Sequence, residues 1–261
     1  MPMKSSDPID QIHVPGWRVE TVEATVSTNQ LAGARAEAGE PGGWAVVADH
    51  QSGGKGRRGN RWEAPPGSSL LMSAILRPTA PMMQWPRLAV ATAVAVCRAI
   101  EATTRLLPEI KWPNDILIDG HKVAGILLES RAPGSQSPGW VIVGVGINVH
   151  SRDFPLGLRY PATSLALAGG HAPARADLAA ALLAALEEES SRATGSGWDE
   201  VLRAYATRDA LVGHRIRAES HGQVVEGLDS GLDPEGELIV RPDPGAPPIV
   251  LRDAHGITLL D

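Results

Sequence analysis

Cysteine, long apolar runs and net positive charge are all scarce in this chain of 261 residues. The only cysteine, Cys97, excludes an intrachain disulfide and a cysteine-based metal cluster, and its apolar neighbours predict a small buried residue. The longest apolar run is about half of the ~20 residues that a membrane helix needs, and the first residues show no apolar signal segment. We therefore expect a cytoplasmic protein with no membrane partner.

The charge balance is acidic, with 30 Asp and Glu against 24 Lys and Arg and a formal net charge of -6. A chain of this charge lacks the overall attraction of a general nucleic-acid binder, so any basic patch must be local. The composition, 43% hydrophobic and 21% charged, is that of an ordinary globular protein. Its length predicts one large domain with a small partner domain.

Hydrophobic periodicity divides the chain into two regions. The first region mixes strands and helices, including a long apolar helix over 84–104 and two helices over 175–209. From about residue 212 the pattern changes to short strands punctuated by Gly, Pro and Asp, which is typical of a small β-barrel. We expect a larger domain over 18–210, which would carry any catalytic site, and a small β-domain over 211–261.

The segment ADHQSGGKGRRGNRW, residues 48–62, carries a G-x-G-x-x-G spacing. A dinucleotide-binding turn is excluded because two prolines follow where a helix should run, and no acidic residue lies between Glu63 and Glu101. A P-loop is excluded because no Gly-Lys is followed by Ser or Thr. The remaining interpretations are an anion-binding nest of backbone N–H groups, assisted by Lys55, Arg57, Arg58 and Arg61, or a solvated basic loop.

A hairpin turning at Asp119-Gly120 gives the second local signal. Regular pairing opposes Leu117 to Lys122 and Asp115 to Ala124, which predicts that Asp115 and Lys122 point the same way, about 7–8 Å apart. It also places Lys122 on the buried face that carries Ala124, Ile126 and Leu128. A lysine there needs an anion, which is either a ligand or Asp115 itself. Gly125 permits close approach of a ligand to the backbone.

Five motifs in this order resemble the monofunctional (class I) biotin protein ligases, the biotin–[acetyl-CoA-carboxylase] ligase family. They are STN at 27–29, QSGGKGRRGNRW at 51–62, KWPND at 111–115, KVAGIL at 122–127 and GVGINV at 144–149. The resemblance implies an α+β fold, in which helices pack on a mixed β-sheet as in class II synthetases, followed by a C-terminal SH3-like β-barrel. It covers about residues 18–210, and the C-terminal strands resemble the SH3-like cap of that family.

The resemblance also implies a two-step reaction. Biotin and Mg²⁺-ATP give biotinyl-5'-AMP and pyrophosphate, and a lysine of a biotin carboxyl carrier protein domain then takes the biotin. Cations that offset the crowded negative charge are what such a step requires. Lys122 and Arg57 would be catalytic, and Asp115 would meet the metal. The implied biotin-binding residues are Ser27, Thr28, Asn29, Gln51, Gly54, Lys55, Gly56, Arg57, Lys122 and Gly125. The implied ATP-binding residues are Arg57, Arg58, Trp62, Asn114, Asp115, Lys122 and Asn148.

Local roles compete with several of these assignments. Ser27 and Thr28 could serve only to cap a helix, Trp62 only to pack, and Asn148 only to satisfy a strand end. The loop also departs from the family's usual GRGRRGR, because lysine stands at Lys55 and asparagine at Asn60, which puts in doubt how tightly it holds the adenylate.

Two other functions compete with biotin ligation: a lipoate or octanoate protein ligase, and a non-catalytic protein that binds a nucleotide or an acidic partner. The combination of GRRG with KWPND and KVAGIL favours biotin. Fewer than 20 residues precede the first strand, against roughly 50 for a small domain, so we expect no DNA-binding repressor domain and no nucleic-acid partner. The sequence leaves open whether the protein forms a homodimer.

Overall fold

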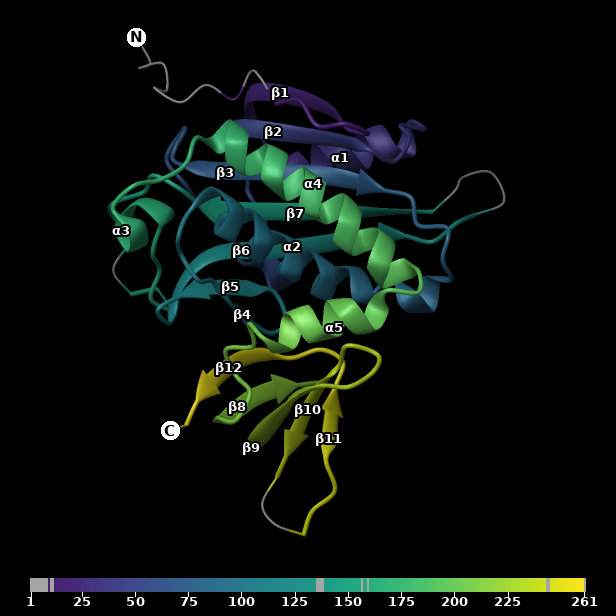
Figure 1. Cartoon of the computed structure of the whole chain (residues 1–261), viewed down its shortest axis with the longest axis vertical. Coiled ribbons are helices and arrows are strands. Elements are labelled where there is room, and N and C mark those ends of the chain that lie inside the picture. Colours follow the sequence, from purple (N-terminus) through teal and green to yellow (C-terminus); the bar gives the residue numbers. More distant parts are fainter. Residues whose placement is uncertain are drawn as a thin grey trace.

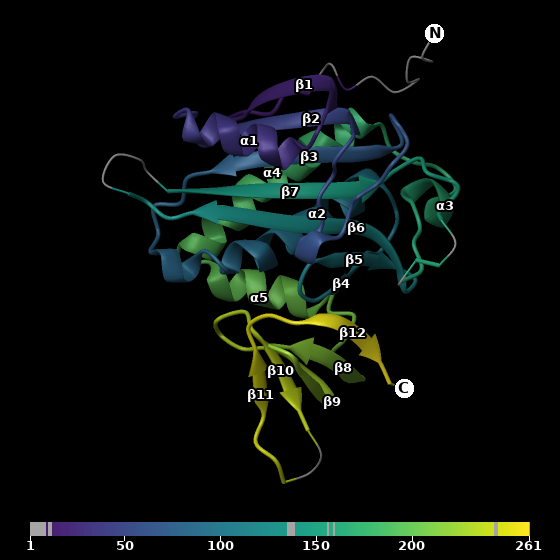
Figure 2. The same cartoon turned by 180° about the vertical axis from the view of Figure 1, so that it is seen from behind.

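The computed structural model describes residues 9, 12–134, 139–155, 157–158, 160–242 and 245–260. They form a seven-stranded sheet with helices on both faces and a separate five-stranded sheet at the C-terminal end (Figures 1 and 2). The predicted α+β class is thus confirmed. No helix in the described ranges is long and apolar enough to cross a membrane.

The larger sheet is mixed. Its strand order is β1-β2-β3-β7-β6-β5-β4, and only β1 and β2 run parallel, because α1 connects them as a crossover. The strands are β1 (Arg18–Thr25), β2 (Trp44–Gln51), β3 (Ser69–Leu76), β4 (Glu109–Lys111), β5 (Asp115–Ile118), β6 (His121–Arg131) and β7 (Trp140–Asn148). Every residue of β3 is buried, as its position between β2 and β7 requires.

Helices cover both faces of this sheet. The helices are α1 (Thr28–Glu37), α2 (Arg87–Thr103), α3 (Leu165–Gly169), α4 (Arg175–Thr194) and α5 (Trp198–Ala206), with 3-10 turns at η1 (Arg57–Gly59) and η2 (Met82–Gln84). α2 and α4 pack together over one face and form the main core with it (Figure 1). Cys97 lies within α2 as predicted, and burial raises the pKa of its thiol. α1 covers the opposite face, over β2, β3 and β7 (Figure 2).

The β5–β6 hairpin corrects one prediction. Ile118 pairs with His121 and Leu117 with Lys122 as expected, but Ile116 pairs with Ala124, so Asp115 lies opposite Gly125. Val123 is the extra residue of a β-bulge, which changes the faces to which the neighbouring side chains point. The predicted pairing of Asp115 with Ala124 was therefore wrong by one residue.

The C-terminal sheet has the order β11-β10-β9-β8-β12. Its strands are β8 (Arg215–Ser220), β9 (Gln223–Leu232), β10 (Leu238–Arg241), β11 (Ile249–Leu251) and β12 (His255–Leu259). The predicted short strands are present, but among the described residues no ladder joins β11 to β12 to close a barrel. Figure 1 shows this sheet next to α5 and β4. Trp198 of α5 fixes the junction by donating its indole N–H to the Pro234 carbonyl at 2.6 Å.

Candidate functional site

A cavity of about 580 Å³ opens on the face of the large sheet opposite α2 and α4. Its walls come from the start of α1, the loop after β2, strands β6 and β7, the turn between β4 and β5, residues 154, 155, 158, 160 and 162, and residues 254–257 of the C-terminal sheet. Except for Gly54, every residue that the sequence analysis assigned to the site lines this cavity, namely Ser27, Thr28, Asn29, Gln51, Lys55, Gly56, Arg57, Arg58, Trp62, Asn114, Asp115, Lys122, Gly125 and Asn148.

One end of the cavity holds a network of hydroxyl and amide groups at the start of α1, which the Glu129 carboxylate anchors from β6. Gln51 Oε1 accepts hydrogen bonds from the Thr28 backbone N–H at 2.7 Å and from its hydroxyl at 2.9 Å. Ser73 Oγ lies 2.7 Å from Thr28 Oγ1 and 2.6 Å from Asn29 Oδ1. The Asn29 amide donates to Glu129 Oε2 at 2.7 Å. These amide and hydroxyl groups match a neutral ligand that both donates and accepts hydrogen bonds.

The network also decides the capping question. Ser27 occupies the N-cap position of α1, but its side chain makes no capping hydrogen bond. The Thr28 hydroxyl instead faces Gln51 and Ser73. A local capping role therefore does not account for these two hydroxyl groups.

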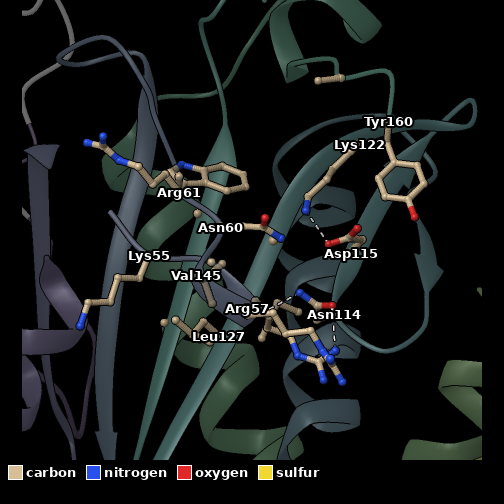
Figure 3. Close-up of a pocket in the computed structure, with 18 of the residues that line it drawn as sticks. Lys55, Arg57, Asn60, Arg61, Asn114, Asp115, Lys122, Leu127, Val145 and Tyr160 are labelled. Atoms are coloured by element: carbon tan, nitrogen blue, oxygen red, sulfur yellow. Dashed lines mark hydrogen bonds and ion pairs between the residues drawn. The ribbon is translucent and has the colours of Figure 1, made fainter. Parts of the chain in front are cut away.

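The glycine loop is a small hairpin. The backbones of Lys55 and Arg61 pair as an isolated antiparallel β-bridge, and the Gly56 N–H donates to the Asn60 carbonyl at 2.8 Å. Gly54 lies behind the lining, where a Cβ atom would come within 2.4 Å of the Trp62 carbonyl oxygen, so the position requires glycine. The Lys55 side chain is exposed and points away from Lys122 and Asp115 (Figure 3). The structure thus does not bring the Lys55 ammonium group to the other cations.

Trp62 closes the loop onto the sheet. A Cβ atom at Gly146 would lie 2.6 Å from the indole, and one at Gly125 would lie 3.0 Å from it. The indole therefore covers bare backbone of β6 and β7, and the Lys122 ammonium lies 5.8 Å from the ring centroid. The indole N–H is buried and has no hydrogen-bond partner among the residues that the structure describes.

Lys122 and Asp115 form an ion pair at the centre of the cavity. Lys122 Nζ lies 2.5 Å from Asp115 Oδ1, with the two side chains 26% and 15% exposed (Figure 3). The long lysine side chain spans the ~7–8 Å expected between the two strand positions, and the β-bulge lies between Lys122 and Gly125, the residue opposite Asp115. The same bulge places the Lys122 ammonium next to Gly125, where a Cβ atom would lie 3.4 Å from Nζ. The ion pair proposed as the structural alternative is therefore present, and it lines the cavity.

Arg57 connects the loop to two distant parts of the chain. Its guanidinium donates to Asn114 Oδ1 at 3.3 Å and to Asp253 of the C-terminal sheet. Arg58 donates to the other oxygen of Asp253 at 2.6 Å. Although burial opposes it, hydrogen bonds and charge from Arg58 and Arg57 lower the pKa of Asp253. This carboxylate is therefore ionised at neutral pH.

Asn148 ends β7 at the cavity wall and is only 7% exposed. Its amide donates to the Thr163 carbonyl at 3.0 Å, and its Oδ1 lies 3.5 Å from Ser69 Oγ. These bonds satisfy the strand end, as the local interpretation expects, while the residue still lines the cavity. Both roles are compatible with this geometry.

The metal assignment rests on Asp115 alone. Within the described ranges no group of three or more His, Cys, Asp or Glu side chains could hold a metal ion. One carboxylate suits Mg²⁺ that arrives on the phosphates of a nucleotide, because Mg²⁺ is commonly held by one or two carboxylates together with substrate phosphates. The residues present thus fit a Mg²⁺ ion held mainly by phosphate groups, to which Asp115 would contribute one carboxylate.

Ser73, Glu129 and Asp253 bond to side chains that line the cavity and were not identified from the sequence. Ser73 lies among the apolar residues of β3, a signal that could have identified it, whereas Glu129 lies at the polar end of β6 next to Ser130 and Arg131 and gives no such signal. Asp253 had no local signal, since only the tertiary fold brings it to Arg57 and Arg58.

Comparisons with known proteins identify the family of the chain. The Biotin/lipoate A/B protein ligase family matches residues 22–148. The bifunctional ligase/repressor BirA of Bacillus spizizenii is 36% identical over 229 residues, covering 87% of this chain and 70% of that protein. The biotin--[acetyl-CoA-carboxylase] ligase of Mycobacterium tuberculosis is 34% identical over 230 residues, covering 85% of this chain and 83% of that protein.

A solved structure shows the same fold. The biotin protein ligase from Aquifex aeolicus in complex with biotin and ATP superposes with a TM-score of 0.80 at 24% identity, covering 93% of this chain and 99% of that one. The chain therefore belongs to the Biotin/lipoate A/B protein ligase family, where it groups with biotin protein ligases.

Proposed function

We propose that this protein activates biotin with ATP as biotinyl-5'-AMP and transfers the biotinyl group to a lysine of a biotin carboxyl carrier protein domain. The observation that carries the proposal is that the lining of one cavity joins a set of hydroxyl and amide side chains to a set of cations. A neutral ring with N–H and C=O groups fits the first part, and a carboxylate next to a phosphate fits the second. Relatives named biotin--[acetyl-CoA-carboxylase] ligase support both the acid and the acceptor.

In the first step, an oxygen of the biotin carboxylate attacks the α-phosphorus of ATP. A new bond forms between this oxygen and the α-phosphorus, while the bond from the α-phosphorus to the oxygen that bridges it to the β-phosphorus breaks, and pyrophosphate leaves with the electron pair. Two anionic groups come together, so the transition state needs positive charge that is already in place. Lys122 supplies it from a bulged strand, and Arg57 supplies it from the glycine loop.

Asp115 holds the Lys122 ammonium and, with Asn114, faces the nucleotide. Mg²⁺ bound to ATP would offset further phosphate charge, and Asp115 is the residue that would meet it. The Trp62 indole would contact the nucleotide, and Asn148 the adenine. Ser27, Thr28, Asn29 and Gln51 would bind the ureido ring.

In the second step, the amine of the acceptor lysine attacks the carbonyl carbon of the adenylate. An amide C–N bond forms, the C–O bond to phosphate breaks, and AMP leaves with both electrons of that bond. The amine loses a proton to solvent. The protein's part in this step is to keep the mixed anhydride away from water until the acceptor arrives.

The test is pyrophosphate release in the presence of ATP, Mg²⁺ and one acid at a time: biotin, lipoate or octanoate. We expect release with biotin that exceeds release with either other acid by at least about tenfold. Preference for lipoate or octanoate would assign the chain to the other activity of its family. ATP binding without release for any acid would favour a non-catalytic binding protein.

A further inference from the structure

One carboxylate of the C-terminal sheet lies between the two arginines of the glycine loop. Asp253 follows β11, and its two oxygens accept separately from Arg57 and from Arg58. The Arg58 contact measures 2.6 Å. Two adjacent guanidinium groups repel each other, so a shared anion between them is favourable.

The carboxylate is presented from a fixed backbone. The Ser220 hydroxyl of β8 donates to the Asp253 carbonyl at 2.7 Å. The next four residues, 254–257, form part of the cavity wall. Asp253 is therefore held at the mouth of the cavity and not on a freely moving tail.

The loop side of the contact is under backbone constraint. Arg58 has a φ of 55°, in the left-handed region that a residue with a side chain rarely adopts. In this conformation its guanidinium reaches Asp253. The three side chains are 30% (Arg57), 44% (Arg58) and 40% (Asp253) exposed, and ion pairs at such exposure are individually weak and easily exchanged.

We infer that Asp253 is a resident counter-ion: it holds Arg57 and Arg58 in the free protein and yields them to the phosphates of the nucleotide. A triphosphate carries more charge and more acceptor oxygens than one carboxylate, and its geometry suits the guanidinium fork better. Asp253 is thus a positioning residue that competes with ATP while keeping the loop docked on the C-terminal sheet. The inference rests on the proposed function for the identity of the phosphate ligand.

The test compares Asp253→Asn with the wild-type protein in two measurements. Hydrogen exchange of residues 54–62 in the ligand-free protein reports whether the contact holds the loop. Calorimetric binding of α,β-methylene ATP in saturating biotin reports the competition, because this analogue does not allow adenylate formation. We expect faster loop exchange and a dissociation constant about three- to tenfold lower, the range set by two exposed ion pairs.

Two further variants make the result specific. Asp253→Glu keeps the charge and should restore both values to near wild type. Glu226→Gln removes a carboxylate from an exposed ion pair on the same sheet, and should leave both values unchanged. Unchanged loop exchange in Asp253→Asn, or binding of the analogue that is equal or weaker, would overturn the inference. Neither measurement needs turnover, so a wild-type protein that binds the analogue but makes no adenylate would refute only the proposed function.

Discussion

Lys122 reaches the cavity because of one extra residue in β6. In a regular hairpin it would lie on the same face as Ala124 and Ile126, whose side chains belong to the core. The bulge at Val123 instead places its ammonium next to Gly125 and Asp115. A lysine in a bulged strand, paired with one acid and only 26% exposed, has the features of a cation kept ready for an anionic ligand.

Replacing this lysine separates a catalytic role from a structural one. Lys122→Gln keeps much of the length and removes the charge, so pyrophosphate release should fall by roughly 10²-fold or more. The melting temperature should also fall by a few degrees, because Asp115 loses its partner. Arg131→Gln, which breaks an exposed ion pair at the far end of β6, is the control and should change neither value appreciably. A destabilised Lys122→Gln with normal turnover per folded molecule would show that the ion pair is only structural.

The two basic residues of the loop should differ in importance. Arg57 is in the cavity and donates to Asn114, whereas Lys55 is exposed and points away. Arg57→Gln should lower kcat/KM for ATP by at least about tenfold, and Lys55→Gln by less than about threefold. Steady-state kinetics of the two variants under the same conditions make the comparison. Equal losses would mean that the loop rearranges on binding and brings Lys55 to the ligand.

The glycine loop is the element that the sequence described best. Its failure to match either nucleotide fingerprint left an anion-binding nest or a solvated basic loop, and the structure shows that Arg57 and Arg58 of this loop line the cavity. The secondary structure was equally readable, because β3, α2 and β7 carry apolar patterns that packing does not override.

The remaining features depend on tertiary structure. From the sequence, the strand register of the hairpin could be predicted only from its turn residues, Asp119 and Gly120. These residues give no sign of the bulge at Val123. Asp253 is 195 residues beyond Arg58 and meets it only because the tertiary fold brings residues 254–257 of the C-terminal sheet to the cavity wall. Short α3 was missed because five residues give too little periodicity for a helix to be recognised.

Docking of the loop should depend on Gly146. A methyl group there would meet Trp62, so Gly146→Ala should displace the indole from the sheet. We expect faster hydrogen exchange of residues 54–62 and weaker adenylate formation. Gly33→Ala is the control: it lies in α1 with open space around its Cβ position, and should be neutral or slightly stabilising. If Gly146→Ala leaves loop exchange unchanged, the contact with Trp62 does not hold the loop.

At the scale of the whole molecule, a buried acid lies where the chain enters the C-terminal sheet. Asp229 of β9 is 1% exposed, and its backbone bonds to Gly213 and His214 in the segment that follows α5. Burial raises its pKa to about 7, with nearby Asp209 adding to the effect. The folded state therefore favours the protonated carboxyl of Asp229, and ionisation of this group lowers the free energy of unfolding.

The pH dependence of stability follows from this shift. The folded pKa, about 7, lies above the reference value of 3.8, so the free energy of unfolding should decline as pH rises from about 4 to about 7 and then level off for this group. Asp229→Asn should flatten the decline, as measured by denaturant unfolding across that range. Glu226→Gln, which removes an exposed carboxylate from the same strand, should retain it. An unchanged pH profile in Asp229→Asn would show that this residue stays charged in the folded protein.

DNA binding also concerns the whole molecule. A net charge of -6 gives little attraction for phosphates, so retention of duplex DNA at physiological salt should be negligible with or without biotin. A mobility assay with genomic fragments tests this. Biotin-dependent, sequence-specific retention would contradict it and align the chain with its ligase/repressor relatives.

The most direct test of the central claim is mass spectrometry of a biotin carrier domain after incubation with this protein, ATP, Mg²⁺ and biotin. The account predicts one biotinyl group on a single lysine of the carrier. It also predicts no modification when ATP is omitted, and roughly 10²-fold slower modification with Lys122→Gln. A carrier that stays unmodified, while the protein is folded and binds both ligands, would contradict the account.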